Sequence, residues 1–145
     1  MPFLKGICLL LFGASLVFAG VELDRMLLLA SQRYGDAGAS SVTAWRTLLT
    51  STAGQSDSVK LQRVNDFFNR RTRFRDDRDI WGVEDYWASP LEVLGRAEGD
   101  CEDFAIAKYM TLKLMGVSSD KMRLAYVKAR LGGPQSSLVQ AHMVL

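Results

Sequence analysis

The stretch Gly99–Met110, GDCEDFAIAKYM, decides the interpretation of this chain because it places a cysteine at a predicted helix start. Hydrophobic residues follow Cys101 at steps of three and four as far as Met115, and Gly116 ends the pattern. Asp100 is a suitable residue to cap that helix. The first N–H groups of a helix are unpaired and stabilise a thiolate or an oxyanion. Cys101 is therefore a candidate nucleophile.

Acidic residues surround this cysteine, and they disfavour its thiolate. One carboxylate ~7 Å away costs the thiolate about 2.4 kcal/mol at an effective dielectric of ~20, which exceeds one pK unit. The helix terminus offsets only ~0.3–1 kcal/mol. Cys101 is thus a poor nucleophile unless these acids face bulk water or are neutralised. The acids are Glu98, Asp100, Glu102 and Asp103.

A bound cation is one way to neutralise these acids. Asp100 is explained as a helix cap, which leaves the other three. Carboxylates with no second thiolate or histidine nearby favour calcium over zinc as the ion. The spacing is not that of an EF-hand loop. A calcium site beside Cys101 is therefore a hypothesis at this point, and solvated acids are its alternative.

Histidine is the usual base for a cysteine nucleophile, and the chain has only one, His142. The chain has two cysteines, and Cys8 lies in an apolar N-terminal segment that export would remove. An unpaired cysteine in an exported chain indicates intermolecular pairing or a functional thiol. We therefore predict a Cys101–His142 dyad. The alternative is a small core cysteine and a hydrogen-bonded structural histidine.

The first residues have the layout of a secretory signal peptide. Lys5 precedes an apolar run over 7–19, and Val17-Phe18-Ala19 places small or modest residues before a cleavage point. The run is shorter than the ~20 residues that cross a bilayer as a helix. We predict a signal peptide over 1–19 and a single domain over 20–145, with an uncleaved membrane anchor as the alternative.

The rest of the chain predicts helices first and strands last, which is an α+β class. Helices are expected over 21–34 and 42–49, with a small-residue loop over 35–41 between them. A third helix is expected after a cap at Asp57 or Ser58 and ends near residue 71. A long loop with Trp81, Tyr86 and Trp87 includes one helical turn at 89–94. The segments 121–130 and 138–145 alternate as a β-hairpin around a Gly-Gly-Pro turn. Because the chain stops inside a strand, we expect a fragment or a truncated product.

The composition gives no support to nucleic-acid binding as a function. The chain of 145 residues is 48% hydrophobic and 23% charged, and its formal net charge is +2. These proportions are those of an ordinary globular domain. So small a net charge gives no reason to expect nucleic acid as a partner.

The motifs EGDCEDFAIAKYMTLKLMGV, WASPLEVLGR before it and AHMVL after it resemble the bacterial transglutaminase-like cysteine proteinases of the LapG type. The resemblance runs from about Trp45 to the last residue and includes VNDFFNRR. It implies a papain-like, transglutaminase-type core in which the nucleophile helix packs on an antiparallel sheet, incomplete here. By position, Cys101 is the nucleophile and His142 the base. Asp100 and Glu102 match the calcium ligands, and Asp103 is a weaker candidate.

The resemblance also implies a biological role. Such proteins are periplasmic, calcium-dependent proteases that release large biofilm adhesins by cutting near the adhesin N-terminus. An inner-membrane receptor for cyclic di-GMP sequesters them. The family's triad aspartate follows the histidine by more residues than this chain contains. Two other functions stay open: a protein-cross-linking transglutaminase, and a catalytically inert module that binds calcium or a partner.

Overall fold

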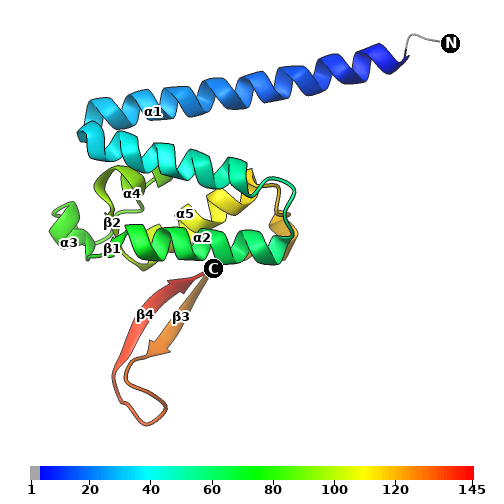
Figure 1. Ribbon diagram of the computed structural model, residues 1–145. Helices are drawn as coiled ribbons and strands as arrows, with labels where there is room; N and C mark the ends of the chain where they lie inside the picture. The colour runs from blue at the N-terminus through cyan, green and yellow to red at the C-terminus, as the bar shows by residue number, and fades with distance from the viewer. Residues whose placement is uncertain (1–3) are drawn as a thin grey trace.

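Helix α1 (Leu4–Ser51) reverses direction at Gly35, where φ is 64° and ψ is −156°. The computed structural model describes the backbone of residues 4–145 and the side chains from residue 22 onward. The two arms of α1 lie side by side and antiparallel over the other helices (Figure 1). Only glycine adopts such a φ at low cost, so Gly35 acts as the hinge of this helical hairpin. The predicted signal peptide over 1–19 lies outside the described side chains.

The loop predicted over 35–41 is wrong, because the second arm of the helix begins directly after Gly35. The sequence there is rich in alanine and serine, which are acceptable inside a helix. The hydroxyls of Ser41 and Thr43 donate to carbonyls four residues earlier, Ala37 O at 3.0 Å and Ala39 O at 2.9 Å. These bonds satisfy the polar side chains without interrupting the helix. No helix in the described part of the chain has an apolar stretch long enough to span a bilayer.

The helix α2 (Asp57–Arg71) begins at a serine cap and buries one face. Ser56 is the N-cap, its side chain accepting from the N–H of Val59, so the predicted caps at residues 57 and 58 are wrong by one or two positions. The buried residues of α2 are Val64 and Phe68. The end near residue 71 is confirmed.

The predicted long loop with Trp81, Tyr86 and Trp87, called the aromatic segment below, covers residues 73–99 and contains more regular secondary structure than its glycines suggest. It contains β1 (Arg73–Phe74), α3 (Asp77–Ile80), α4 (Pro90–Arg96) and β2 (Glu98–Gly99). The two short strands pair in parallel, with Arg73 opposite Glu98 and Phe74 opposite Gly99. A capping box between Ser89 and Glu92 starts α4, which confirms the predicted helical turn. Two-residue strands show no alternation, so sequence patterns do not reveal them.

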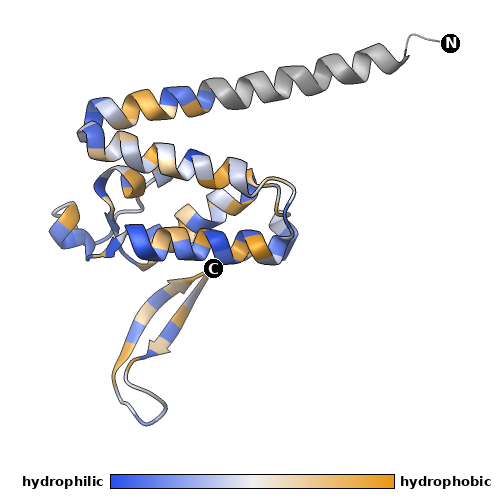
Figure 2. Ribbon diagram, viewed as in Figure 1, coloured by the Kyte–Doolittle hydropathy of each residue, from blue (hydrophilic) through white to orange (hydrophobic). Residues whose placement is uncertain are grey.

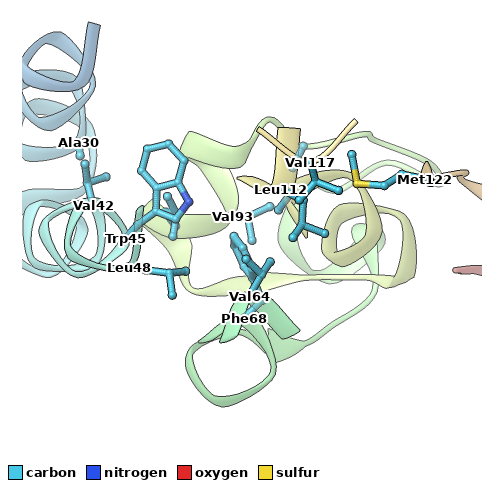
Figure 3. Close-up of a cluster of buried hydrophobic side chains, with 13 residues drawn as sticks. Ala30, Val42, Trp45, Leu48, Val64, Phe68, Val93, Leu112, Val117 and Met122 are labelled. Carbon is cyan, nitrogen blue, oxygen red and sulfur yellow. The ribbon is translucent and has the colours of Figure 1, made fainter. Parts of the chain in front are cut away.

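Helix α5 (Cys101–Leu114) lies at the centre and completes the core. It packs against α2, α4 and the hairpin. Trp45 from α1 and Leu112 from α5 meet Val64, Phe68 and Val93 in one buried cluster (Figure 3). The indole N–H of Trp45 donates to the hydroxyl of Thr111 at 2.9 Å, which joins α1 to α5 inside this cluster. The predicted helix from Cys101 is thus confirmed, and Leu114 is its last residue.

The hairpin follows a 3₁₀ turn, η1 (Ser119–Lys121), and projects from the helical body (Figure 1). Strands β3 (Ala125–Arg130) and β4 (Val139–Val144) are antiparallel, with Val127 opposite His142 and Tyr126 opposite Met143. Hydrophobic residues line both strands (Figure 2), yet Met143 alone of these positions is buried. Helices followed by a hairpin that contacts α5 through β4 confirm the α+β prediction.

Candidate active site

The pairing of β1 with β2 brings two distant segments to the start of α5. The N–H of Arg73 donates to Ala97 O at 2.8 Å, and the N–H of Arg75 donates to Gly99 O at 3.0 Å. Both arginines also pair with the carboxylate of Glu98. The hydrogen bond from Arg73 is the main reason why the pKa of Glu98 is lowered. Glu98 is therefore neutralised by cations of its own and is not one of the acids that burden Cys101.

Asp100 and Asp103 form the capping box that begins α5. Asp100 accepts from the N–H of Asp103 at 3.4 Å, and Asp103 accepts from the N–H of Asp100 at 3.4 Å. The second oxygen of Asp103 accepts from the N–H of Ala88 at 2.7 Å. Asp103 is 0% exposed, and burial raises its pKa to about 6. Asp100 is the predicted cap, whereas Asp103 mainly anchors the aromatic segment to the helix.

The thiol of Cys101 is held by a carboxylate. Its Sγ donates to Oε2 of Glu102 at 2.8 Å. Burial first, and then this bond to Glu102, raises the pKa of Cys101 to about 11, while the backbone N–H of Met143 opposes the shift. The acids therefore act in the direction that the charge estimate from the sequence predicts. Without a compensating cation, Cys101 is a protonated thiol at neutral pH.

His142 shares a groove with Cys101 but is not hydrogen-bonded to it. The groove has a volume of about 640 Å³ and is bounded by α2, α5 and the end of β4, with both residues in its lining. Among the side chains that the structure describes, the only hydrogen-bond acceptor of the thiol is Glu102. The fold thus brings the two predicted residues to one site. The Cys101–His142 dyad itself stays a prediction.

A cluster of carboxylates lies beside the thiol. Asp77, Asp100 and Asp103 place ligand atoms within 4.8 Å of one another, and so do Asp77, Asp85 and Glu102. A third such group is Asp100, Cys101 and Glu102. Burial, followed by repulsion from Glu102 and Asp77, raises the pKa of Asp100 to about 7. Within the described side chains, no cationic group forms an ion pair with these carboxylates, so their mutual repulsion is not offset.

Asp77 is one of two members of this cluster, with Asp85, that the sequence motif does not contain. It is 3% exposed, and its Oδ2 accepts from the N–H of Tyr86 at 2.5 Å. Its other oxygen, Oδ1, is buried with no hydrogen-bond partner. A buried carboxylate oxygen without a partner is costly and requires an explanation. Oxygen ligands at this density are those that a hard divalent cation prefers, so the donor set fits calcium.

Asp77 and Asp85 could not be selected from the sequence as site residues. They stand among other acids in an irregular segment, and only the β1–β2 pairing brings that segment to Asp100. One available signal was the length of the aromatic segment, since long ordered loops are often functional. A carboxylate count alone does not distinguish Asp77 from its exposed neighbour Asp79.

The two tryptophans of the aromatic segment have different environments. Trp81 stacks on Tyr86 with ring centroids 4.3 Å apart, and the guanidinium of Arg96 lies 4.3 Å from its ring centroid. It therefore braces the segment that carries Asp77 and Asp85. Trp87 is 55% exposed, and its ring centroid is 6.5 Å from that of Tyr126 on β3. Trp87 is a surface residue beside the site.

Comparison with known proteins places this arrangement in a family. Residues 36–144 match the family described as bacterial transglutaminase-like cysteine proteinase, BTLCP. The structure is similar to Legionella pneumophila LapG, with 40% identity, a TM-score of 0.66, and coverage of 83% of this chain and 62% of that chain.

The calcium-bound form of the same Legionella protein gives the same identity and coverage and a TM-score of 0.65. This chain thus spans about three-fifths of the length of these solved structures. A comparison with curated proteins found no match. The family match and the structural similarity together confirm the transglutaminase-type fold. The chain belongs to the bacterial transglutaminase-like cysteine proteinases.

Proposed function

We propose that this chain is the catalytic part of a calcium-dependent cysteine endopeptidase with Cys101 as its nucleophile. The observation that carries the proposal is the position of Cys101. It stands at the N-terminus of α5, in a groove shared with His142 and beside the carboxylate cluster of Asp77 and Glu102. Membership of a cysteine proteinase family supports peptide hydrolysis as the reaction.

The residues of the groove have distinct roles in this mechanism. The sulfur of Cys101 attacks the carbonyl carbon of the scissile bond, and His142 takes the thiol proton. The protonated imidazole then gives that proton to the departing amine, which leaves a thioester on Cys101. Water attacks the thioester with His142 as base, and the acid product is released. Repositioning of the His142 ring toward the sulfur must precede the first step.

Backbone groups at the start of α5 provide the oxyanion site. The helix leaves the N–H groups of its first residues unpaired, and Asp100 accepts that of Asp103. The N–H groups of Cys101 and Glu102 remain for the oxygen that becomes negatively charged in the tetrahedral intermediate. The nucleophile and its oxyanion donors therefore come from the same helical turn.

The carboxylate cluster would hold the calcium ion through Asp77, Asp85, Asp100 and Glu102. A bound calcium ion supplies positive charge that offsets these carboxylates and so favours the thiolate of Cys101. Glu102 is the residue that connects the two sites, because it belongs to the cluster and accepts the thiol proton. A Glu102 carboxylate engaged with a cation is a weaker acceptor for that proton.

The biological setting is part of the same proposal and rests on the family likeness. We propose that the protein acts in the periplasm after export by its signal peptide. Its substrate is the N-terminal region of a large surface adhesin, whose cleavage controls biofilm attachment. An inner-membrane receptor for cyclic di-GMP is the proposed regulatory partner. The 40% identity to Legionella pneumophila LapG supports this assignment.

An inert binding module is the competing function, and one observation favours it. The thiol donates to Glu102 rather than to His142, and burial raises its pKa. The two functions differ in the reactivity of Cys101. An inert module has a thiol that alkylates no faster than a free peptide thiol at about pH 6.5, with or without calcium. A protease has a thiol that alkylates faster once calcium is present.

The test combines cleavage with thiol labelling. Cleavage of an adhesin N-terminal fragment is followed with calcium and with a chelator, for the native chain, Cys101→Ser and Ser118→Ala. We expect cleavage only with calcium and only when Cys101 is present, while Ser118→Ala, a change outside the groove and the carboxylate cluster, serves as the control. Amine incorporation in place of hydrolysis would instead identify a cross-linking enzyme. Cleavage at the native rate by Cys101→Ser would refute the assignment of the nucleophile.

A further inference from the structure

Two buried carboxylates of the cluster are held by one short stretch of backbone, the 85–88 segment. The N–H of Tyr86 donates to Oδ2 of Asp77 at 2.5 Å, and the N–H of Ala88 donates to Oδ1 of Asp103 at 2.7 Å. The first residue of the segment is itself a member of the cluster. The position of this segment therefore sets the positions of acids from α3, from α5 and from the segment itself.

The bond from Tyr86 also decides which oxygen of Asp77 is free. Oδ2 is occupied by the N–H of Tyr86, whereas Oδ1 is buried and has no hydrogen-bond partner in the described part of the chain. Because one oxygen is held, rotation of the carboxylate is restricted before any ion binds. Preorganised ligands lose less conformational freedom on binding than mobile ones. The free oxygen of Asp77 thus owes its orientation to Tyr86.

Tyr86 is in turn anchored by its side chain. Its hydroxyl donates to Oε1 of Glu92 on α4 at 2.9 Å. Its ring stacks on that of Trp81, which is the C-cap of the helix that carries Asp77. A single side chain therefore connects α4 with α3 and fixes the backbone between them.

The hydroxyl of Tyr86 is not needed to start α4. The capping box of that helix is complete without it, since Ser89 accepts from the N–H of Glu92, and Oε2 of Glu92 accepts from the N–H of Ser89 at 2.7 Å. The Tyr86 hydroxyl binds Oε1, the oxygen that the cap leaves free. The cap holds the Glu92 carboxylate in place, and this carboxylate then serves as an anchor for the 85–88 segment.

We infer that Tyr86 is a positioning residue for the cation, because its hydroxyl bond to Glu92 holds the 85–88 segment, and with it Asp77, in the arrangement that binds calcium. This inference rests on the calcium site of the proposed function. It adds to that site a side chain outside the set of carboxylate ligands. Hydrogen-bond partners of metal ligands commonly change metal affinity by tenfold or more.

The test is calorimetric titration of calcium into the native chain and into Tyr86→Phe. This variant removes only the hydroxyl and leaves the ring and the net charge unchanged. We expect it to bind calcium about tenfold more weakly, which is the lower end of such effects because the bond to Glu92 is exposed to solvent. Tyr109→Phe removes a hydroxyl from α5 outside this network and serves as the matched control, with native affinity expected.

Urea unfolding with and without calcium separates positioning from general stability. A purely structural hydroxyl would lower the free energy of unfolding equally in both conditions and leave the calcium Kd unchanged. Loss of a positioning hydroxyl lowers it more when calcium is present, because the variant gains less from binding. Equal destabilisation of Tyr86→Phe in the two conditions would therefore overturn the inference.

The variant Glu92→Ala tests the route through α4. In that background the Tyr86 hydroxyl has lost its acceptor, so adding Tyr86→Phe is expected to change calcium affinity no further. A tenfold loss from Tyr86→Phe in both backgrounds would show that the hydroxyl does not act through Glu92, which contradicts the inference.

The outcomes distinguish this inference from the proposed function. Native calcium affinity in Tyr86→Phe overturns the positioning role and leaves both the calcium site and the protease assignment standing. A native chain that binds no calcium overturns the calcium site and this inference together. Cleavage that depends on Cys101 would in that case still support peptide hydrolysis as the reaction.

Discussion

Glu102 belongs both to the surroundings of the Cys101 thiol and to the carboxylate cluster. Its carboxylate accepts the thiol proton of Cys101 at 2.8 Å and also belongs to two of the three carboxylate groups. A single side chain thus connects the protonation of the nucleophile with the charge of the cluster. On the proposed function, neutralising the cluster with a cation therefore favours the thiolate of Cys101, and removing the cation favours the thiol.

Asp77 provides the sharpest test of the cation site at the scale of single residues. Asp77→Asn keeps an oxygen for the N–H of Tyr86 but removes one negative charge and one ligand. We expect calcium affinity to fall at least about tenfold, because a charged ligand is worth roughly 1.5–3 kcal/mol. Calorimetric titration of the purified chain measures this directly. The control is Asp79→Asn, an exposed acid on the same helix that pairs with Arg75.

Equal losses of affinity in these two variants would contradict the ligand role of Asp77. They would show that calcium responds only to the net negative charge of the α3 region. An unchanged affinity in Asp77→Asn would contradict it as well. The ligand role of Asp77 requires that calcium affinity falls in Asp77→Asn and stays unchanged in Asp79→Asn.

Residues inside the cysteine motif were predictable, and those outside it were not. The cap of α5 and the crowding of acids around Cys101 follow from neighbours in sequence, whereas the largest cause of the raised Cys101 pKa is burial. Asp77 reaches the site through tertiary structure, and its burial depends on the packing of Tyr86 and Trp81. Sequence periodicity carries no information about such a contact.

At the scale of elements, α4 approaches α1 closely because Gly95 has no side chain. A Cβ at this position would overlap the ring of Tyr34, which lies between the two helices. The same side chain packs near Gly38 on the second arm of α1. Glycine inside a helix is normally destabilising relative to alanine by about 1 kcal/mol. At Gly95 the gain from close packing outweighs this cost.

This packing predicts a reversal of the usual effect of glycine replacement. We expect Gly95→Ala to lower the free energy of unfolding by about 1–3 kcal/mol, because the Tyr34 ring must move. The urea midpoint at constant m-value reports the change. Tyr34→Ala combined with Gly95→Ala should lose less than the sum of the single variants, since the overlap is then removed. A stabilised Gly95→Ala chain would contradict the close approach.

The helices differ in how well the sequence predicts them, because some depend on local signals and others on tertiary packing. Helix α5 has an N-cap, a hydrophobic period and a terminal glycine, so its bounds follow from the sequence to within one residue. The segment after Gly35 resembles a loop in sequence because small residues carry no hydrophobic period. Its helix is stabilised instead by packing against α4, which is a tertiary effect.

The whole molecule is packed unevenly. The helical body contains nearly the entire buried core, whereas the β3–β4 hairpin projects from it (Figure 1). Met143, 5% exposed, is the single buried residue of the two strands. Isolated two-stranded hairpins are marginal in water. The part of the site on α5 is therefore enclosed by the core, whereas His142 lies on a strand with one buried side chain.

Hydrogen exchange is expected to show this difference. Amides of β3 and β4 should exchange through local opening, while those of α2 and α5 should exchange only with global unfolding. Mass spectrometry of peptides covering 125–144 and 101–114 measures both rates in one experiment. Comparable protection of the two segments would contradict the uneven packing.

Fold class was predictable at this scale, but the geometry of the site was not. The order of helices and strands and the cysteine motif are enough to indicate the α+β transglutaminase-type fold, which the family match confirms. The distance between Cys101 and His142 depends on how β4 packs against α5, where Met143 is the buried residue of the strand. Such a contact is invisible in a pattern of alternating residues.

The parallel β1–β2 pair has a consequence for the order of folding. It joins residues 73–74 to residues 98–99, so it closes a long loop that carries Asp77 and Asp85 to the start of α5. Loop closure of this kind is entropically costly and follows the formation of local helices. The two segments whose carboxylates form the cluster therefore come together late, after the local helices have formed. On the proposed function, a chain that is still folding lacks part of the calcium ligand set, so the order of assembly keeps Cys101 inactive until the fold is complete.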